Sequence, residues 1–387
     1  MNCASLAGCW ISCGVSLACG AALGLVSGKT LLSAPVTSPS IYTDKGRITG
    51  AWPYTMAADG GFAAFTAGGG AVVESRWQGP HFLSLKPDGV ALPLRTPWKS
   101  PCKYAFGGAI SPNRVLFATT VRGRRLGRWR VCVWDVARRL NTPTVVPGHS
   151  NGTADGLAFS PDSREIASVD YQAHRWVIAI HDAVDGKTDC ILRFPQRVNI
   201  AGNSAQIRFL AQNRVVSAVG NGTGSITCWA VHSGRVLYSK RIPKVAALST
   251  DALCVSAHRL LVAGPSLGDR TKQLVISLDP ATGKATGFLN VNKSGKGSPV
   301  AKWYDISHIC VSPDGRYALV TESGFRGRTH GMGDVGRIVV VDLARMKVVY
   351  RSVVLPDLWC VDVAPDGKRA LLAGSTRVYI WHPPFKL

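Results

Sequence analysis

The feature that most constrains this chain is a short sequence pattern that recurs along it. In its three clearest copies an apolar run leads into a Pro-Asp turn and a second apolar run follows: GLAFSPDSREIASVD from Gly156, HICVSPDGRYALVTE from His308 and CVDVAPDGKRALLAG from Cys360. Alternating, β-branched runs on either side of a tight turn indicate paired antiparallel strands. Weaker copies bring the total to seven, 46 to 56 residues apart, with turn residues at Ala58, Pro112, Pro161, Ala211, Ala257, Pro313 and Pro365.

Each copy continues in the same way. A variable loop leads to a third strand that often ends in aspartate, as at Asp135, Asp182, Asp279 and Asp342, and a turn then leads to a fourth strand. No convincing amphipathic helix follows residue 30. Seven units of four strands each predict an all-β chain folded as a seven-bladed β-propeller of antiparallel blades.

Several residues resemble the WD-repeat propellers. Trp134-Asp135 is a full Trp-Asp dipeptide, and Gly148-His149 is a Gly-His pair ahead of a blade. His181 stands where the third blade would carry tryptophan, and most blades lack Gly-His. The resemblance covers nearly all of residues 41–387. The Ser-Pro-Asp-Gly turns also resemble bacterial lactonase-like and dehydrogenase-like propellers, so the resemblance implies either an interaction scaffold or a propeller enzyme.

The last repeat shows only three strands before the chain stops, which would leave an open sheet edge. The segment IYTDKGRIT, residues 41–49, has strand character and precedes the first repeat. We therefore predict that it closes the ring by pairing with the strand that ends at Trp381. On this interpretation residues 31–387 form a single propeller domain.

Residues 1–30 differ from everything that follows. No charged residue occurs before Lys29, and residues 6–26 form an apolar stretch that suits a signal peptide or a membrane anchor. We expect an exported or membrane-anchored protein; a cytoplasmic protein with a disordered leader is the alternative. Four of the 11 cysteines lie in this leader. The other seven, mostly inside apolar strands, are expected to be reduced core residues rather than metal ligands.

The chain is strongly basic, with 45 Lys and Arg against 23 Asp and Glu and a net charge of +22. In an up-and-down blade, the second-to-third and fourth-to-first connectors emerge on one face, which we call the connector face. Two of its loops are rich in arginine, and one of them carries five arginines in nine residues. The candidate partner-binding residues are Arg122, Arg124, Arg125, Arg128, Arg130, Arg326, Arg328 and His330, with Arg337 in the same sixth-blade loop.

Such a rim is suited to an anionic partner. A protein with an acidic surface is the first candidate, and a polyanion such as a glycan, lipid headgroups or nucleic acid is the second. The opposing interpretation is that arginine, frequent throughout this chain, simply solvates exposed loops.

Three residues are candidates for the axial channel. Arg208 and Asp362 fall at an inner-strand position where other blades have small residues, and His308 lies nearby on the sixth blade. Charges satisfied by backbone and water are the simpler explanation. Pairs such as His308 with Asp305, or Asp170 with Glu322, lack recognisable metal-ligand spacing. His149, Asp170 and Ser168 fit the structural hydrogen-bonding set of WD repeats better than a catalytic triad.

The sequence thus favours a monomeric, non-catalytic interaction scaffold without a cofactor. A lactonase-like or dehydrogenase-like enzyme with its site in the axial channel is the first alternative. A cell-envelope polyanion binder is the second. No nucleophile elbow, phosphate loop or dinucleotide fingerprint is present in the sequence.

Overall fold

The structure is a computed structural model, and the chain divides into two units, Met1–Leu32 and Ser33–Leu387. Only parts of the second unit are described here. These are residues 41–43, 46–53, 62–75, 79–85, 91–93, 104–122, 129–138, 143–146, 156–172, 175–195, 205–219, 224–246, 248–249, 253–256, 259–269, 271–292, 302–325, 335–352, 354–356, 358–374 and 377–387.

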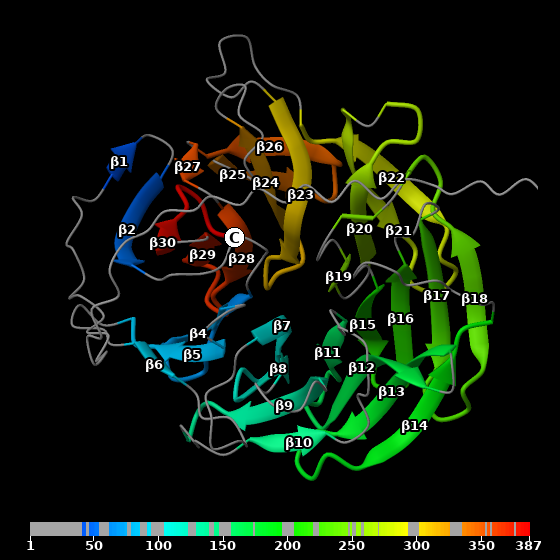
Figure 1. The fold of residues 1–387 in the computed structure, drawn as a ribbon. Coiled ribbons are helices and arrows are strands. Elements are labelled where there is room, and N and C mark those ends of the chain that lie inside the picture. Colours follow the sequence, from blue (N-terminus) through cyan, green and yellow to red (C-terminus); the bar gives the residue numbers. More distant parts are fainter. Residues whose placement is uncertain are drawn as a thin grey trace, which may run out of the picture. The chain divides into compact units, whose positions relative to one another are not determined.

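Every named element of the second unit is a β-strand, and the strands form seven antiparallel sheets arranged as a ring (Figure 1). The first four blades follow the chain in order. Blade 1 has β3 (Ala63–Phe65), β4 (Ala71–Ser75), β5 (Gly79–Leu83) and β6 (Ala91–Pro93); blade 2 has β7 (Tyr104–Ile110), β8 (Leu116–Arg122), β9 (Trp129–Asp135) and β10 (Thr144–Val146); blade 3 has β11 (Leu157–Phe159), β12 (Glu165–Gln172), β13 (Arg175–Asp182) and β14 (Thr188–Arg193); blade 4 has β15 (Ala205–Ala211), β16 (Arg214–Val219), β17 (Ser225–Ala230) and β18 (Val236–Arg241).

The remaining blades keep the same order up to blade 7, where the first described strands join the last three. Blade 5 has β19 (Leu253–Ser256), β20 (Arg259–Pro265), β21 (Gln273–Leu278) and β22 (Ala285–Asn290); blade 6 has β23 (Lys302–Val311), β24 (Tyr317–Phe325), β25 (Val335–Asp342), β26 (Lys347–Arg351) and the short β27 (Leu355–Pro356); blade 7 has β28 (Leu358–Val363), β29 (Ala370–Gly374), β30 (Arg377–His382), β2 (Gly46–Pro53) and β1 (Ile41–Thr43). The predicted seven-bladed propeller is confirmed.

Blade 7 joins both ends of this unit. Strand β2 pairs antiparallel with β30, with Ile48 opposite Trp381, and β1 pairs with β2 as an additional outer strand. In Figure 1 the blue β2 therefore lies beside the red β30. The predicted closing segment was residues 41–49, whereas the strand that pairs with β30 is Gly46–Pro53.

Blade 1 requires a correction. The sequence pattern placed the first turn of this blade at Ala58, which lies outside the described residues. The inner strand is β3, and the first turn is instead Thr66–Gly70, where the Thr66 amide donates to the Gly70 carbonyl at 2.9 Å. The Asp59-Gly60-Gly61 sequence resembled a turn, whereas the real turn is built from glycines, with Gly69 at φ 75°.

The Ser-Pro-Asp sequences form the first-to-second-strand turns through one repeated set of side-chain bonds. In blade 6 the Ser312 hydroxyl donates to Asp314 at 2.6 Å and accepts from the Tyr317 amide at 2.9 Å. Ser160 and Ser111 make the equivalent bonds in blades 3 and 2. These side-chain bonds add to the backbone bonds of the turn, such as that from the Ser312 amide to the Tyr317 carbonyl at 2.8 Å, which explains their recurrence without any catalytic role.

The aspartates that end the third strands also have a structural role. The Asp182 carboxylate accepts the Val184 amide at 2.7 Å, and Asp279 accepts the Ala281 amide at the same distance. Asp135 and Asp342 make similar bonds to the turns that follow them. Each carboxylate thereby starts the turn into the fourth strand.

Among the described residues, one apolar cluster lies between each pair of neighbouring blades, and Val335 with Val354 forms a small further one. Trp134, Trp229 and Trp381 hold equivalent third-strand positions and are almost completely buried. At that position in blade 3, His181 instead bonds Ser168 at 3.2 Å and Thr188 at 3.0 Å. The described bond of Ser168 is thus to His181, and the Asp170 carboxylate accepts from the Gln172 amide at 2.8 Å. His149 lies outside the described residues, so the predicted set of His149, Asp170 and Ser168 stays a prediction.

The C-terminal residues are held against a turn of blade 7. The C-terminal tail folds back on blade 7, where the Leu387 amide donates to the Gly367 carbonyl at 3.0 Å. A Cβ at Gly367 would lie 2.4 Å from the Leu387 carbonyl oxygen, so glycine is required there. Among the described residues, no helix is long and apolar enough to cross a membrane. The predicted leader, residues 1–30, lies outside them.

Candidate functional site

The basic rim was predicted on two connectors, and the structure describes the strands that carry them. The loop of blade 2 leaves β8 at Arg122 and enters β9 at Trp129, and the loop of blade 6 joins β24 to β25. Both connectors therefore emerge on the connector face. Arg122 lies over the Trp129 ring, 5.8 Å from its centroid, and Arg130 is half-buried. The other candidates lie outside the described residues: Arg124, Arg125, Arg128, Arg326, Arg328 and His330.

Arg337 was expected to belong to the exposed blade 6 loop, and this expectation was wrong. The residue lies inside β25, is 6% exposed, and its Nε donates to Glu322 Oε2 at 2.6 Å. Glu322 is fully buried opposite it on β24. Burial, opposed by the Arg337 charge, raises the pKa of Glu322 to about 7. The two residues form an internal ion pair rather than a rim cation and a metal ligand.

The opposite face, which we call the turn face, carries the first-to-second and third-to-fourth turns. Three of its acidic residues lie near basic residues of the same turn: Asp135 with Arg138 at 3.6 Å, Asp366 with Arg369 at 3.9 Å, and Asp342 with Arg345 at 4.0 Å. Exposed pairs of this kind contribute little to stability, but they balance the charge locally.

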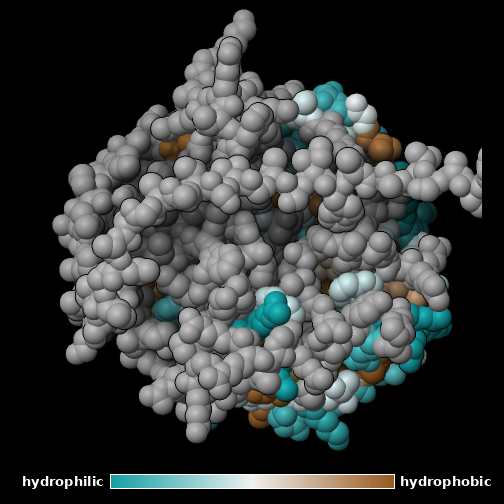
Figure 2. Space-filling model, in the orientation of Figure 1, coloured by the Kyte–Doolittle hydropathy of each residue, from teal (hydrophilic) through white to brown (hydrophobic). Residues whose placement is uncertain are grey.

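Apolar side chains do not gather on the described surface. The large exposed ones are scattered over different turns and outer strands: Val184, Ile191, Leu267, Phe288 and Val349. Figure 2 shows the same on one face, where brown residues stand singly among teal ones along the coloured part of the ring. Scattered apolar residues are normal on soluble surfaces and define no docking patch.

A cavity of about 520 Å³ occupies the axis of the ring. It is lined by inner-strand residues of every blade, together with turn residues such as Ser111, Pro112 and Pro161, so it lies at the turn-face end. All three predicted channel residues, Arg208, His308 and Asp362, line this one cavity. The structure thus brings together the three residues that the inner-strand alignment had placed on the axis. Their role as a binding site stays a prediction.

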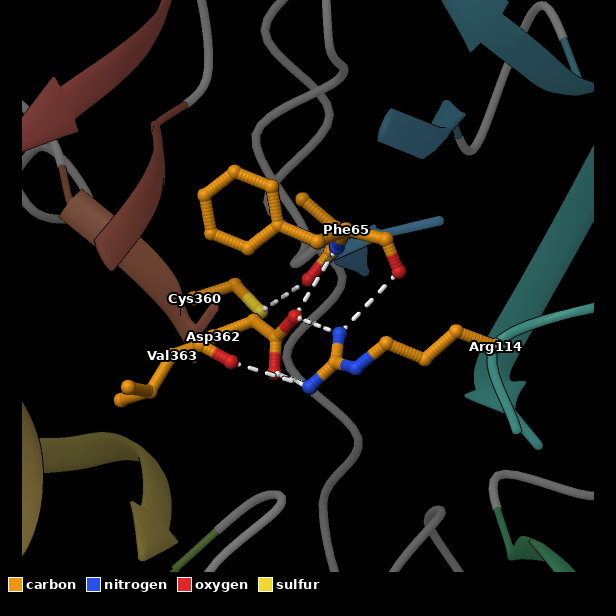
Figure 3. A network of polar contacts seen from close by, with 6 residues as sticks. Phe65, Arg114, Cys360, Asp362 and Val363 are labelled. Carbon is orange, nitrogen blue, oxygen red and sulfur yellow. Dashed lines mark hydrogen bonds and ion pairs between the residues drawn. The ribbon is translucent and has the colours of Figure 1, made fainter. Parts of the chain in front are cut away.

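Asp362 is held by an arginine that the sequence analysis did not single out. Arg114, from the blade 2 turn, donates through its two terminal nitrogens to the Asp362 carboxylate at 2.5 and 3.1 Å (Figure 3). The same guanidinium donates to the carbonyls of Phe65 at 3.0 Å and Val363 at 2.9 Å, and the Phe65 amide donates to Asp362 at 2.9 Å. This network, which we call the Arg114 clamp, joins blade 2 to blade 7 across blade 1.

The backbone of Arg114 supports a dedicated role for its side chain. Its φ is 58°, in the left-handed region that favours glycine, and the equivalent turn positions in blades 6 and 7 are Gly315 and Gly367. Asp362 raises the pKa of Arg114, against the effect of burial. The available sequence signal was therefore an arginine at the glycine position of a Ser-Pro-Asp-Gly-like turn.

Arg208 and His308 face the same cavity with few partners. The Arg208 guanidinium donates to the Ile207 carbonyl at 2.8 Å and makes no ion pair among the described residues. His308 is 8% exposed, and its Nδ1 has no hydrogen-bond partner there. Burial and then the Arg208 charge lower the pKa of His308 to about 3, so the imidazole is neutral at pH 7.

Cysteines complete the cavity wall. Cys254 and Cys310 line it, and burial raises the pKa of both thiols. All six cysteines in the described segments are free: Cys132, Cys190, Cys228, Cys254, Cys310 and Cys360. The same segments hold no group of three His, Cys, Asp or Glu side chains placed to bind a metal.

Comparisons with known proteins reveal similarity of fold only. No protein-family model matches the chain, and no curated protein sequence is similar to it. One similar solved structure is a Kuenenia stuttgartiensis hydrazine synthase, with a TM-score of 0.51 and 13% identity over 69% of this chain and 73% of that chain. A chain of a mitotic checkpoint complex has a TM-score of 0.60 and 15% identity over 93% and 97%. These similarities and the ring together establish a seven-bladed β-propeller.

Proposed function

We propose that this chain is a WD-repeat-like binding scaffold whose connector face captures a protein partner with an acidic surface. The observation that carries the proposal is the concentration of arginine at the β8–β9 connector. On the turn face, three acidic residues lie near basic residues of the same turns. The β8–β9 connector and the strand ends on either side of it instead carry five arginines in nine residues, 122–130, in a chain of net charge +22. A concentration of one sign on one face favours capture of an opposite charge.

The fold supports this use of the connectors. Each blade buries its core against its neighbours, so the strand ends from which the connectors leave are fixed by packing that does not involve the connector sequences. One structural neighbour comes from a multiprotein assembly, the mitotic checkpoint complex. A scaffold needs a rigid frame and complementary charge; the described blades form the frame, and the sequence carries the charge.

The test compares two charge-reversal variants in affinity capture with mass spectrometry. The first changes Arg122, Arg124, Arg125 and Arg128 to Glu on the connector face. The second makes the same change in net charge on exposed turn-face residues: Arg164, Arg235, Lys284 and Lys368. We expect the first variant to lose the captured acidic proteins and the second to retain them. The second should melt close to wild type because exposed charges contribute little to folding. The first should melt slightly lower, since Arg122 also lies over the Trp129 ring.

A salt series separates a protein partner from a polyanion. Nucleic acid held by five phosphate contacts would give a slope of log affinity against log salt of about −4.5. Binding to heparin or nucleic acid, without any captured acidic protein, would favour the polyanion function. Equal capture by wild type and both variants would contradict a role for the connector-face arginines.

We also propose that residues 6–26 export or anchor the protein, so that the partner is met at the cell envelope. This proposal rests on the uncharged apolar leader in the sequence. Cell fractionation of the full chain, and of a chain lacking residues 1–30, tests it. Identical distribution of the two in the cytoplasm would contradict the proposal.

A further inference from the structure

The axial cavity is separate from the connector face and carries its own charge. Of its charged groups, Arg114 and Asp362 neutralise each other within the Arg114 clamp. Arg208 remains, and among the described residues its guanidinium has no anionic partner. The described wall of the cavity therefore presents one uncompensated positive charge. A buried or partly buried charge normally has a partner, and here the space beside it is open.

His308 gives an independent observation at the same place. The side chain is more than nine-tenths buried, lines the cavity, and keeps Nδ1 without a partner in the described structure. Buried polar atoms are usually satisfied, so an exception calls for an explanation such as a ligand. A neutral imidazole has one N–H donor and one acceptor nitrogen, and its donor suits an anionic oxygen.

We propose that the axial cavity binds a small organic monocarboxylate, whose carboxylate pairs with Arg208 and accepts a hydrogen bond from His308. The cavity volume of about 520 Å³ lies within the range of small-molecule sites. Much of the remaining wall is apolar, including Leu157, Phe159 and Val255, and suits a hydrocarbon body. Arginine matches a carboxylate because its planar N–H groups can contact both oxygens.

A doubly charged phosphate monoester fits this cavity less well. A dianion needs a second cation, and the other guanidinium in the wall, Arg114, is already held in the Arg114 clamp. His308 supplies no charge at neutral pH. The single free charge of Arg208 therefore favours a monoanion.

The experiment measures binding to the full chain by isothermal titration calorimetry. The probes are benzoate, hexanoate, uncharged benzamide and phenyl phosphate. We expect wild type to bind at least one carboxylate about tenfold more tightly than benzamide. The variant Arg208→Gln should lose this preference. The variant Arg235→Gln changes an exposed arginine on a third-to-fourth-strand turn of the same blade and should retain it.

Two more variants separate recognition from general damage to the fold. His308→Phe should weaken carboxylate binding about threefold or more while benzamide binding stays unchanged. Arg208→Glu should no longer prefer a carboxylate over benzamide and should instead prefer the cation benzylamine. A misfolded chain would not give this result.

Three results would overturn the proposal. One is that neither benzoate nor hexanoate shows saturable binding at concentrations up to about 10 mM. Another is a carboxylate preference that survives Arg208→Gln. The third is tighter binding of phenyl phosphate than of either carboxylate. None of these measurements involves the connector face, so the cavity proposal and the scaffold proposal can fail separately.

Discussion

Replacing Arg114 tests whether the Arg114 clamp stabilises the ring. Arg114→Met removes four hydrogen bonds, two to Asp362 and one each to Phe65 and Val363, and leaves the Asp362 carboxylate without its counter-charge. The two charged side chains are 18% and 17% exposed. Breaking a fully buried pair costs about 3–5 kcal/mol, so for this largely buried pair we expect a loss of about 3 kcal/mol.

A second substitution at the same residue isolates the side chain from the backbone. Because Arg114 has a φ of 58°, a non-glycine residue there carries strain of about 1 kcal/mol, which glycine relieves. Arg114→Gly should therefore destabilise the chain by about 2 kcal/mol, less than Arg114→Met. Ser163→Gly is the matched control, since Ser163 occupies the equivalent blade 3 turn position at φ 65°. It should change stability by no more than about 1 kcal/mol.

Urea unfolding and melting scans measure these differences. At about 2 °C per kcal/mol for a large domain, the methionine variant should melt about 6 °C below wild type and the glycine variant about 4 °C below. Combining Arg114→Met with Asp362→Asn should cost less than the sum of the two single variants, because both break the same pair. A glycine variant at least as stable as wild type, or additive effects of the two substitutions, would refute this explanation.

Three further predictions follow from the described structure. Folding lowers the pKa of His308 from 6.5 to about 3, so between these values only the unfolded chain binds this proton, and the folded state loses stability as pH falls. Urea unfolding at pH 6.5 and at about pH 4 measures this loss. It should be about 3 kcal/mol smaller for His308→Phe than for wild type. Deleting residues 1–53 should lower the melting temperature and promote association on gel filtration, because β30 loses its partner, whereas deleting residues 1–30 should change neither property. Labelling the denatured, non-reduced chain that lacks residues 1–30 should count about seven thiols, and two or more disulfides in peptide maps would contradict this.

The sequence predicted the ring because the information for a repeat is local and recurs. The hydrogen bonds of these turns join residues only two to five positions apart, as at Ser160 and Asp162. The same short sequence therefore forms the same turn in several blades. Blade 1 was misplaced because its real turn consists of glycines and lacks the Pro-Asp signal, while an Asp-Gly sequence stands just before it. The ring itself was insensitive to this error, since only one boundary moved.

The candidate cavity residues could be predicted because they lie at repeated inner-strand positions. The residues that contact their side chains could not be predicted in this way. Aligning the inner strands placed Arg208, His308 and Asp362 around one axis, where the structure has them. The Arg114–Asp362 pair joins residues 248 positions apart and skips one blade, so no periodic pattern contains it. Arg337 was misjudged because its strand begins directly after a glycine-rich stretch, which made the first strand residues resemble a loop.

The positions of Arg114, Arg208 and Arg337 show how charge divides between structure and binding in this propeller. Arg337 and Arg114 each contact a carboxylate, and both pairs are largely or fully buried, so their charges are used within the fold. Arg208 lines the same cavity as Arg114 but lies on blade 4, away from Asp362 on blade 7. Among the described side chains, no carboxylate pairs with its guanidinium. The inner strands thus carry the cavity with this free charge at one end of the axis, while the arginine-rich connectors leave the sheets at the other face. Because a closed ring fixes both ends on the same rigid strands, a ligand in the cavity and a partner on the connector face can be recognised by separate residues.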